Sequence, residues 1–144
     1  MRNIQTRRNK KGKVINMELG IKGSVETVVV YDNTAAKMGS GDQEVFATPC
    51  MIAVMEDAAQ RSVLPYLAEA QATVGTHLDV SHDAATPIGM KVWAESELVE
   101  IEGRKLVFRV EAYDECGSIG KGRHERFIID KEKFMARVKA KQAK

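Results

Sequence analysis

One long helical pattern limits the fold of this chain more than any other feature. It lies in the segment EVFATPCMIAVMEDAAQRSVLPYL, residues 44–67. We expect Thr48 to be the N-cap and Pro49 the first helical residue, where the missing N–H of proline costs nothing. Pro65 predicts an end near residue 64. One face of this helix repeats apolar residues at the spacing of a buried stripe: Met51, Val54, Met55, Ala58 and Val63. Glu56 is an acid in the middle of this largely apolar helix.

Alternating apolar residues predict strands on both sides of the helix. One strand, residues 24–31, precedes it, and the small polar stretch 32–44 between them is expected to be a loop. Four more strands are expected within residues 73–129. Their inward side chains would be Val74, Leu78, Val80, His82, Met90, Val92, Ala94, Leu98, Leu106, Phe108, Val110 and Ala112. A short basic helix starting near Asp130 would contact the domain through Phe134 and Val138.

This order of elements indicates an α+β domain with one mostly antiparallel sheet wrapped around one buried helix. A single small sheet leaves an edge strand and part of one face without cover, which predicts oligomerisation. At 144 residues the chain is long enough for one core, and we place that single domain at residues 17–144. Residues 1–16 would be a basic N-terminal extension, with disorder as one interpretation.

The net charge of +2 conceals a strong division along the chain. Residues 1–16 hold six Lys and Arg and no acid, residues 131–144 hold six against Glu132 alone, and residues 17–130 carry −9. Basic residues confined to the ends favour solvated tails over a nucleic-acid surface. No apolar stretch reaches the length of a membrane span, and no secretory signal is present. Two distant cysteines, Cys50 and Cys116, indicate neither a disulfide framework nor a zinc site. We therefore expect a soluble cytoplasmic protein that binds no nucleic acid and no membrane.

Glu56 is the first candidate for chemistry. It lies eight residues after Thr48, about 80° around the helix, so both side chains can border one cleft. A carboxylate among apolar neighbours can serve as a general base. The alternative is that Glu56 merely ends the apolar face beside solvated Asp57, and the spacing alone does not separate these interpretations.

Three other side chains have both a functional and a structural interpretation. His82 is expected on the core side at the end of its strand, as a catalyst or as a satisfied core histidine; a metal site with His77 and His124 is disfavoured because His77 falls on the opposite face. Cys50, near the helix start, would feel the helix dipole that favours a thiolate, although most small buried cysteines have no chemical role. Arg126 is either a surface charge or a partner for an anionic ligand.

The residues of three segments resemble a known family. EVFATPCMIAVMEDA, VGTHLDVSHDAATPIGMKV and GKGRHERFII are similar, in order and spacing, to the hotdog-fold acyl-CoA thioesterases, in the branch that contains fluoroacetyl-CoA thioesterase. The resemblance covers about residues 17–140. It implies a hotdog fold, with a five-stranded antiparallel sheet around a central helix. It also implies a homodimer, or a dimer of dimers, with active sites at the subunit interface, and no cofactor beyond the coenzyme A of the substrate.

The resemblance also assigns site residues. The family's catalytic threonine, glutamate and histidine fall on Thr48, Glu56 and His82, and its substrate-contacting glycine and arginine fall on Gly75 and Arg126. The implied reaction is hydrolysis of an acyl-CoA, with Glu56 as nucleophile or as the base that activates water.

The substrate implied is a short or medium acyl-CoA. Fluoroacetyl specificity is not carried over, because no aromatic residue stands between Tyr31 and Phe46 to form an apolar lid. Two other functions stay open. One is a non-catalytic acyl-CoA-binding or regulatory protein of the same fold. The other is an enoyl-CoA hydratase, which would need an Asp and a His that this helix start does not offer.

Overall fold

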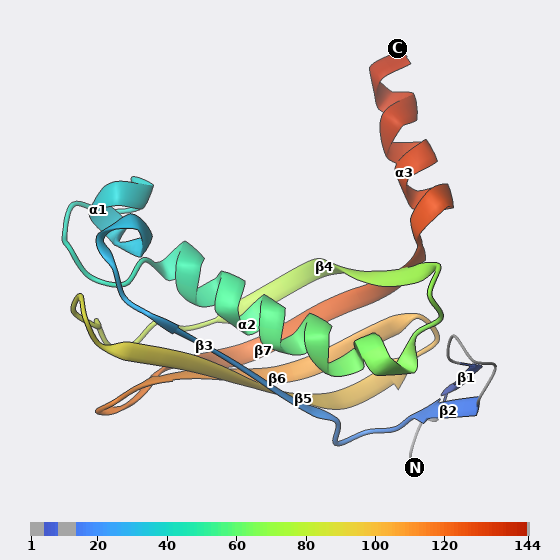
Figure 1. Cartoon of the computed structure of the whole chain (residues 1–144), viewed down its shortest axis with the longest axis horizontal. Helices are drawn as coiled ribbons and strands as arrows, with labels where there is room; N and C mark the ends of the chain where they lie inside the picture. The colour runs from blue at the N-terminus through green and yellow to red at the C-terminus, as the bar shows by residue number, and fades with distance from the viewer. Residues whose placement is uncertain (1–4, 9–13, 144) are drawn as a thin grey trace.

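A five-stranded antiparallel sheet wraps one long helix in the computed structural model, which describes residues 5–8 and 14–143 (Figure 1). The sheet has the order β3-β5-β6-β7-β4, and every neighbouring pair is antiparallel. Its strands are β3 (Lys22–Val28), β4 (Gln71–Val80), β5 (Lys91–Glu102), β6 (Lys105–Asp114) and β7 (Gly117–Asp130). The helices are η1 (Tyr31–Asn33), α1 (Ala35–Met38), α2 (Thr48–Val63), η2 (Leu64–Tyr66), α3 (Lys131–Ala140) and η3 (Lys141–Ala143). The predicted fold class is confirmed.

The core lies between α2 and the face of the sheet that it covers. The predicted inward residues of β5 and β6 are fully buried, which confirms the period-two interpretation of these strands. On α2 the fully buried residues are Met51, Met55, Ala58, Ala59 and Val63. Helix and sheet lie in tight contact at Gly23 of β3, where a Cβ atom would overlap the Ala58 carbonyl oxygen and lie 2.8 Å from Ser62 Cβ. Only glycine lets the backbone of α2 approach β3 this closely.

The start of α2 differs from the prediction. Thr48 is its first residue, and Ala47 occupies the N-cap position without a side-chain hydrogen bond. The Ala47 carbonyl instead accepts the N–H groups of Cys50 and Met51, both at 3.0 Å. The Thr48 hydroxyl does not cap the helix because it is bonded to His82, in a segment 34 residues further along the chain.

A β-bulge in β4 overturns a second prediction. The pairing of β4 with β7 shifts between Gly75 and His77, so one extra residue enters the strand. Val74 is paired with Phe127 on the face away from α2, and Thr73, which is 8% exposed, takes the inward place beside it. Beyond the bulge, Leu78 pairs with buried His124, as the alternation predicts.

The parts outside the sheet and α2 also differ from expectation. The predicted loop at 32–44 contains α1, which Thr34 caps by accepting the Lys37 N–H and which ends at Gly39 in the left-handed conformation. No residue of α3 is buried: Phe134 is half-buried, and Val138 is 42% exposed, so the predicted contact through Val138 is wrong. Within the basic segment, β1 (Gln5–Arg8) and β2 (Val14–Met17) pair as a small antiparallel sheet; residues 1–4 and 9–13 lie outside the described residues. In the described part of the chain, no helix is both long and apolar enough to cross a membrane.

The close approach at Gly23 makes a first prediction. The substitution Gly23→Ala should lower the free energy of unfolding by about 1–3 kcal/mol, because the added methyl group must push the backbone of α2 away from β3. Gly41→Ala is the matched control, since its Cβ would meet only the Ala35 side chain, at 3.3 Å, in an exposed loop. Urea unfolding measures both, and equal stabilities of the two variants would contradict this packing.

The buried His124 makes a second prediction. Burial has the largest effect on His124 and lowers its pKa, the hydrogen bond to His77 comes next and raises it, and the nearby Arg126 charge lowers it further. Below about pH 6.5 the unfolded chain therefore binds a proton that the folded chain does not, so stability falls as the pH falls, by at most about 1.4 kcal/mol per pH unit. The loss between pH 7.5 and 5.5 should be smaller in His124→Gln. Parallel urea titrations test this, and an equal loss in both proteins would contradict it.

Candidate active site

Thr48 and His82 form a pair at the start of α2. The Thr48 Oγ1 and His82 Nδ1 atoms are 2.7 Å apart. Burial lowers the pKa of His82, and a backbone hydrogen bond to Ala84 and the Asp83 charge oppose the shift only in part. The imidazole is therefore neutral near pH 7 and can take a proton from the hydroxyl or polarise it. Thr48 is exposed, so this hydroxyl is open to a ligand.

Glu56 lies two turns further along α2, against β4. A Cβ atom on Gly75 would be only 2.7 Å from Glu56 Oε2, so the glycine leaves room for the carboxylate. The same oxygen is 3.6 Å from Arg126 Nη1, and the Glu56 side chain is 38% exposed. Glu56 is therefore a partly open carboxylate beside a buried cation. Its neighbour Asp57 instead bonds to Arg61 and Gln60 on its own helix.

Arg126 is held from several sides. It is 6% exposed, and Thr73 accepts two of its hydrogen bonds: Nε to Oγ1 at 2.8 Å, and Nη2 to the carbonyl at 2.9 Å. Nη1 lies 3.2 Å from His124 Nε2. Burial lowers the pKa of Arg126, while Glu56 and Asp57 raise it, and a guanidinium keeps its charge in proteins. We call Glu56, Gly75, Arg126, Thr73 and His124 the Glu56 cluster.

The candidate residues thus fall into two groups. Eight residues of helix separate Thr48 from Glu56, which is about 12 Å along the axis. From Gly75 to Val80, the last residue of β4, is about 17 Å of strand. Within one chain, Thr48 and Glu56 therefore do not border the one shared cleft that their spacing predicts. Thr48 lies beside His82, whereas Glu56 lies beside Gly75 and Arg126.

Sequence reasoning missed Thr73 and the role of His124. Thr73 was hidden by the bulge, which moves it to the inner face. The alternation of residues 118–129 predicted that His124 shares a strand face with Arg126, but the only chemistry considered for His124 was metal binding. The three histidines do not gather, and the described residues contain no group of His, Cys, Asp or Glu arranged to hold a metal ion.

Cys50 is a weak candidate for a nucleophile. Its thiol is half-buried, and burial raises its pKa. The position at the helix start therefore does not favour a Cys50 thiolate. The backbone N–H of Cys50 already donates to the Ala47 carbonyl. The structure favours the structural interpretation of this cysteine.

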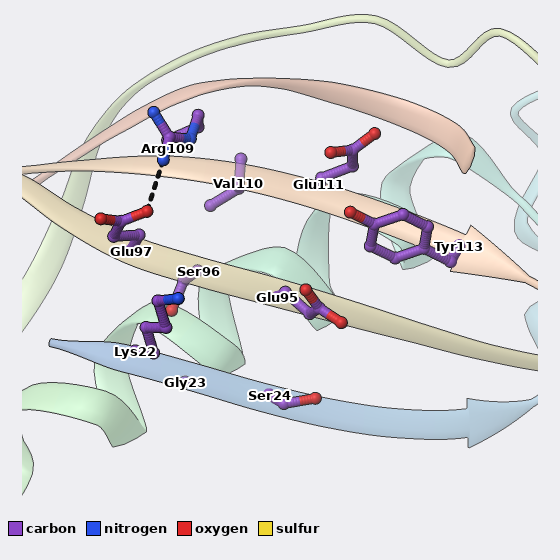
Figure 2. A pocket seen from close by; sticks show the side chains of 10 residues that line it. All are labelled: Lys22, Gly23, Ser24, Glu95, Ser96, Glu97, Arg109, Val110, Glu111 and Tyr113. Atoms are coloured by element: carbon purple, nitrogen blue, oxygen red, sulfur yellow. Dashed lines mark hydrogen bonds and ion pairs between the residues drawn. The ribbon is translucent and has the colours of Figure 1, made fainter. Parts of the chain in front are cut away.

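A shallow hollow of about 520 Å³ opens on the other face of the sheet, away from α2 (Figure 2). Its side chains come from outward positions of β3, β5 and β6, and they include Lys22, Glu95, Glu97, Arg109 and Tyr113. Arg109 and Glu97 are ion-paired across it. Such mutually paired surface charges are typical of a solvated sheet face, and the hollow contains none of the candidate residues.

Comparison with known proteins identifies the family of this chain. The model of the family of fluoroacetyl-CoA-specific thioesterases (FlK) matches residues 29–132. The fluoroacetyl-CoA thioesterase of Streptantibioticus cattleyicolor is 47% identical over 98 residues, which is 68% of this chain and 70% of that protein.

Solved structures agree with the sequence match. The structure of the fluoroacetyl-CoA thioesterase FlK superposes with a TM-score of 0.82 at 39% identity, covering 87% of this chain and 97% of that one. A thioesterase superfamily member from Thermus thermophilus gives a TM-score of 0.81 at 33% identity, covering 87% and 93% of the two chains. A hot-dog-like protein from Thermanaerovibrio acidaminovorans, 22% identical, shares the fold, with a TM-score of 0.78 over 85% and 91%. The chain thus belongs to the fluoroacetyl-CoA-specific thioesterase family, has the hotdog fold and is an acyl-CoA thioester hydrolase.

Proposed function

We propose that this thioesterase hydrolyses a short or medium acyl-CoA at a site formed by Thr48, Glu56 and His82, with Gly75 and Arg126 binding the substrate. The observation that supports it best is the Glu56 carboxylate, which is partly exposed, lies against a glycine and has a buried arginine 3.6 Å away. A reacting acyl group needs a carboxylate within reach, space at the strand and a fixed positive charge, and these residues supply all three.

Hydrolysis can follow either of two routes. Glu56 attacks the thioester carbonyl to give a mixed anhydride that water then cleaves, or it removes a proton from the water that attacks. In both routes the C–S bond breaks, and the sulfur leaves as a thiolate that then takes up a proton. In the tautomer in which Nδ1–H of neutral His82 donates to Thr48 Oγ1, the Thr48 hydroxyl keeps its own hydrogen and would donate it to the developing oxyanion. The first turn of α2 offers few backbone donors, since Pro49 has no N–H and the Cys50 N–H is bonded to Ala47.

The two groups of residues are too far apart in one chain to act on one carbonyl, and we infer that a second copy brings them together. Strand β4 is an edge strand of the sheet, so it is free to pair with its counterpart in a homodimer. The two β4 strands would pair antiparallel, with the two-fold axis at Leu78 or at Asp79. Once the extra residue of the bulge is counted, the first register puts the partner's His82 opposite Thr73, and the second puts it opposite Gly75. Glu56 of one copy would then face Thr48 and His82 of the other.

The acyl group is expected to be aliphatic and not restricted to fluoroacetyl. Phe46, the aromatic residue nearest the helix start, is buried in the core and cannot cover a substrate. Met38 of α1 is half exposed and offers a flexible apolar surface near the start of α2. The F36A variant of a related enzyme, the fluoroacetyl-CoA-specific thioesterase FlK, has been crystallised with fluoroacetate and CoA. This supports a CoA thioester as the substrate class here.

A panel of acyl-CoAs tests the assignment. Release of free thiol, followed with a thiol reagent, should be fastest for an acyl chain between acetyl and octanoyl. Glu56→Ala should lower kcat by at least about 100-fold, and His82→Ala by about 10- to 100-fold, because each removes a group that acts on the carbonyl or on water.

Asp57→Asn is the matched control for the loss of a carboxylate on the same helix, and it should keep most of the activity. Wild-type protein that releases no thiol from any acyl-CoA would refute the proposed function. Full activity in Glu56→Ala would refute the assignment of Glu56.

Mixing the two impaired variants tests the shared site. A heterodimer of Glu56→Ala with His82→Ala would contain one site with both substitutions and one site with neither. Random reassortment makes half of the dimers mixed, so co-refolded variants should recover about a quarter of wild-type activity. If each site lay within one chain, every site would keep a defect and no activity would return. A monomeric particle in light scattering would also contradict the shared site.

A further inference from the structure

Arg126 presents an unusual problem beside Glu56. A guanidinium and a carboxylate in contact normally close into direct, often bidentate, hydrogen bonds. Here Nη1 and Oε2 stop at 3.6 Å, beyond hydrogen-bond distance, although Arg126 is almost fully buried. Some other contact must hold the guanidinium back.

The contacts of Arg126 identify what holds it. Thr73 takes Nε–H through its hydroxyl at 2.8 Å and Nη2–H through its carbonyl at 2.9 Å. His124 Nε2 lies 3.2 Å from Nη1. Three of the five N–H groups of the guanidinium are thus directed at Thr73 and His124, and this fixes the plane of the group.

The tautomer of His124 makes it an acceptor. Its Nδ1 lies 2.9 Å from the carbonyl oxygen of His77, which can only accept, so Nδ1 carries the hydrogen. The other nitrogen, Nε2, then has a free lone pair in the neutral ring and accepts from Arg126. The charged groups that act on this ring are Arg126, Glu56 and Glu125, and a second cation in contact with Arg126 would be unfavourable.

His124 and Arg126 also border the space beside Gly75 that is proposed for the substrate. The empty position of a Cβ on Gly75 is 3.3 Å from His124 Cε1, 3.4 Å from Arg126 Nη1 and 2.7 Å from Glu56 Oε2. The imidazole, the guanidinium and the carboxylate therefore meet around one point at the surface of β4. A shift of the guanidinium by one hydrogen-bond length would change this arrangement.

We propose that Thr73 and His124 are positioning residues, which hold Arg126 away from a direct hydrogen bond with Glu56 and so leave the carboxylate free to react. This proposal rests on the function proposed above and deepens it. Without the acceptor on His124, Nη1 would turn to Glu56 Oε2 and bind the oxygen that the reaction needs. The effect would fall on kcat more than on KM.

Two substitutions at position 124 test this. His124→Phe removes the acceptor but keeps a flat ring, and it should lower kcat at least tenfold with KM changed less than threefold. His124→Gln restores an acceptor through its amide oxygen and should keep most of the activity. Phe108→Leu is the control for packing, because the Phe108 ring lies 6.3 Å from the His124 ring without bonding to it, and it should lower the melting temperature without lowering kcat.

A double-mutant cycle shows whether His124 acts through Arg126. In the background Arg126→Met, His124→Phe should cause little further loss, because the group that it positions is already absent. Losses in kcat that multiply would overturn the proposal, as would wild-type kcat in folded His124→Phe, or equal losses in the Phe and Gln variants.

The outcome separates this proposal from the proposed function. An inactive wild-type protein refutes the function, whereas an active wild type with an unchanged His124→Phe variant refutes only the positioning role. A crystal structure of His124→Phe gives a readout that needs no activity. In that structure, Nη1 of Arg126 should lie within about 3.2 Å of Glu56 Oε2, which is the distance of a normal hydrogen bond. An unmoved guanidinium would overturn the proposal.

Discussion

The packing of α2 against one face of the sheet sets the position of Glu56 relative to the strands. Helix α2 buries Met51, Met55, Ala58 and Val63 on the sheet, and its backbone meets β3 at Gly23, where no side chain fits. This close packing fixes both the rotation of α2 about its axis and its distance from the sheet. The same packing positions Glu56, which lies beside the buried stripe and not within it. Glu56 therefore reaches β4 while part of its side chain stays exposed.

The sheet contributes the polar residues that surround Glu56. Strand β7 contributes His124 and Arg126 to the inner face, and the neighbouring strand β4 contributes Thr73 and Gly75. The bulge in β4 is what puts Thr73 and Gly75 on the inner face together with Leu78 beyond it. A buried arginine is costly unless its N–H groups are bonded, and here the sheet itself provides the acceptors. Arg126, Thr73 and His124 are therefore held in the buried part of the sheet, which favours precise geometry over mobility.

Much of the fold could be predicted from local patterns. The alternation of Leu106, Phe108, Val110 and Ala112 identified β6, and Pro65 marked the end of α2 to within two residues. The bulge could not be predicted, because one inserted residue leaves no local signal and exchanges the faces of Thr73 and Val74. Thr48 was assigned as an N-cap because the sequence does not show that its hydroxyl is bonded to His82.

The sequence gives candidate residues but not their grouping. Glu56, His82 and Arg126 were candidates from the residue pattern, and the resemblance added Gly75 and the catalytic role of Thr48. Their division into two groups follows from distances along α2 and β4. Local spacing placed Thr48 and Glu56 around one helix face, yet the axial rise separates them by about 12 Å. Contacts between distant segments, such as those of Arg126 with Thr73 and His124, depend on strand register, which the sequence alone does not reveal.

The proposed site requires a thioester to bind over Gly75, beside the Glu56 carboxylate. A crystal structure with an acyl-CoA analogue in which the sulfur is replaced by a methylene group tests this position. The ketone carbon is expected within about 4 Å of Glu56 Oε2, with Thr48 and His82 of the second copy on its other side. An analogue bound elsewhere, for example in the hollow beside Arg109 on the opposite face of the sheet, would contradict it.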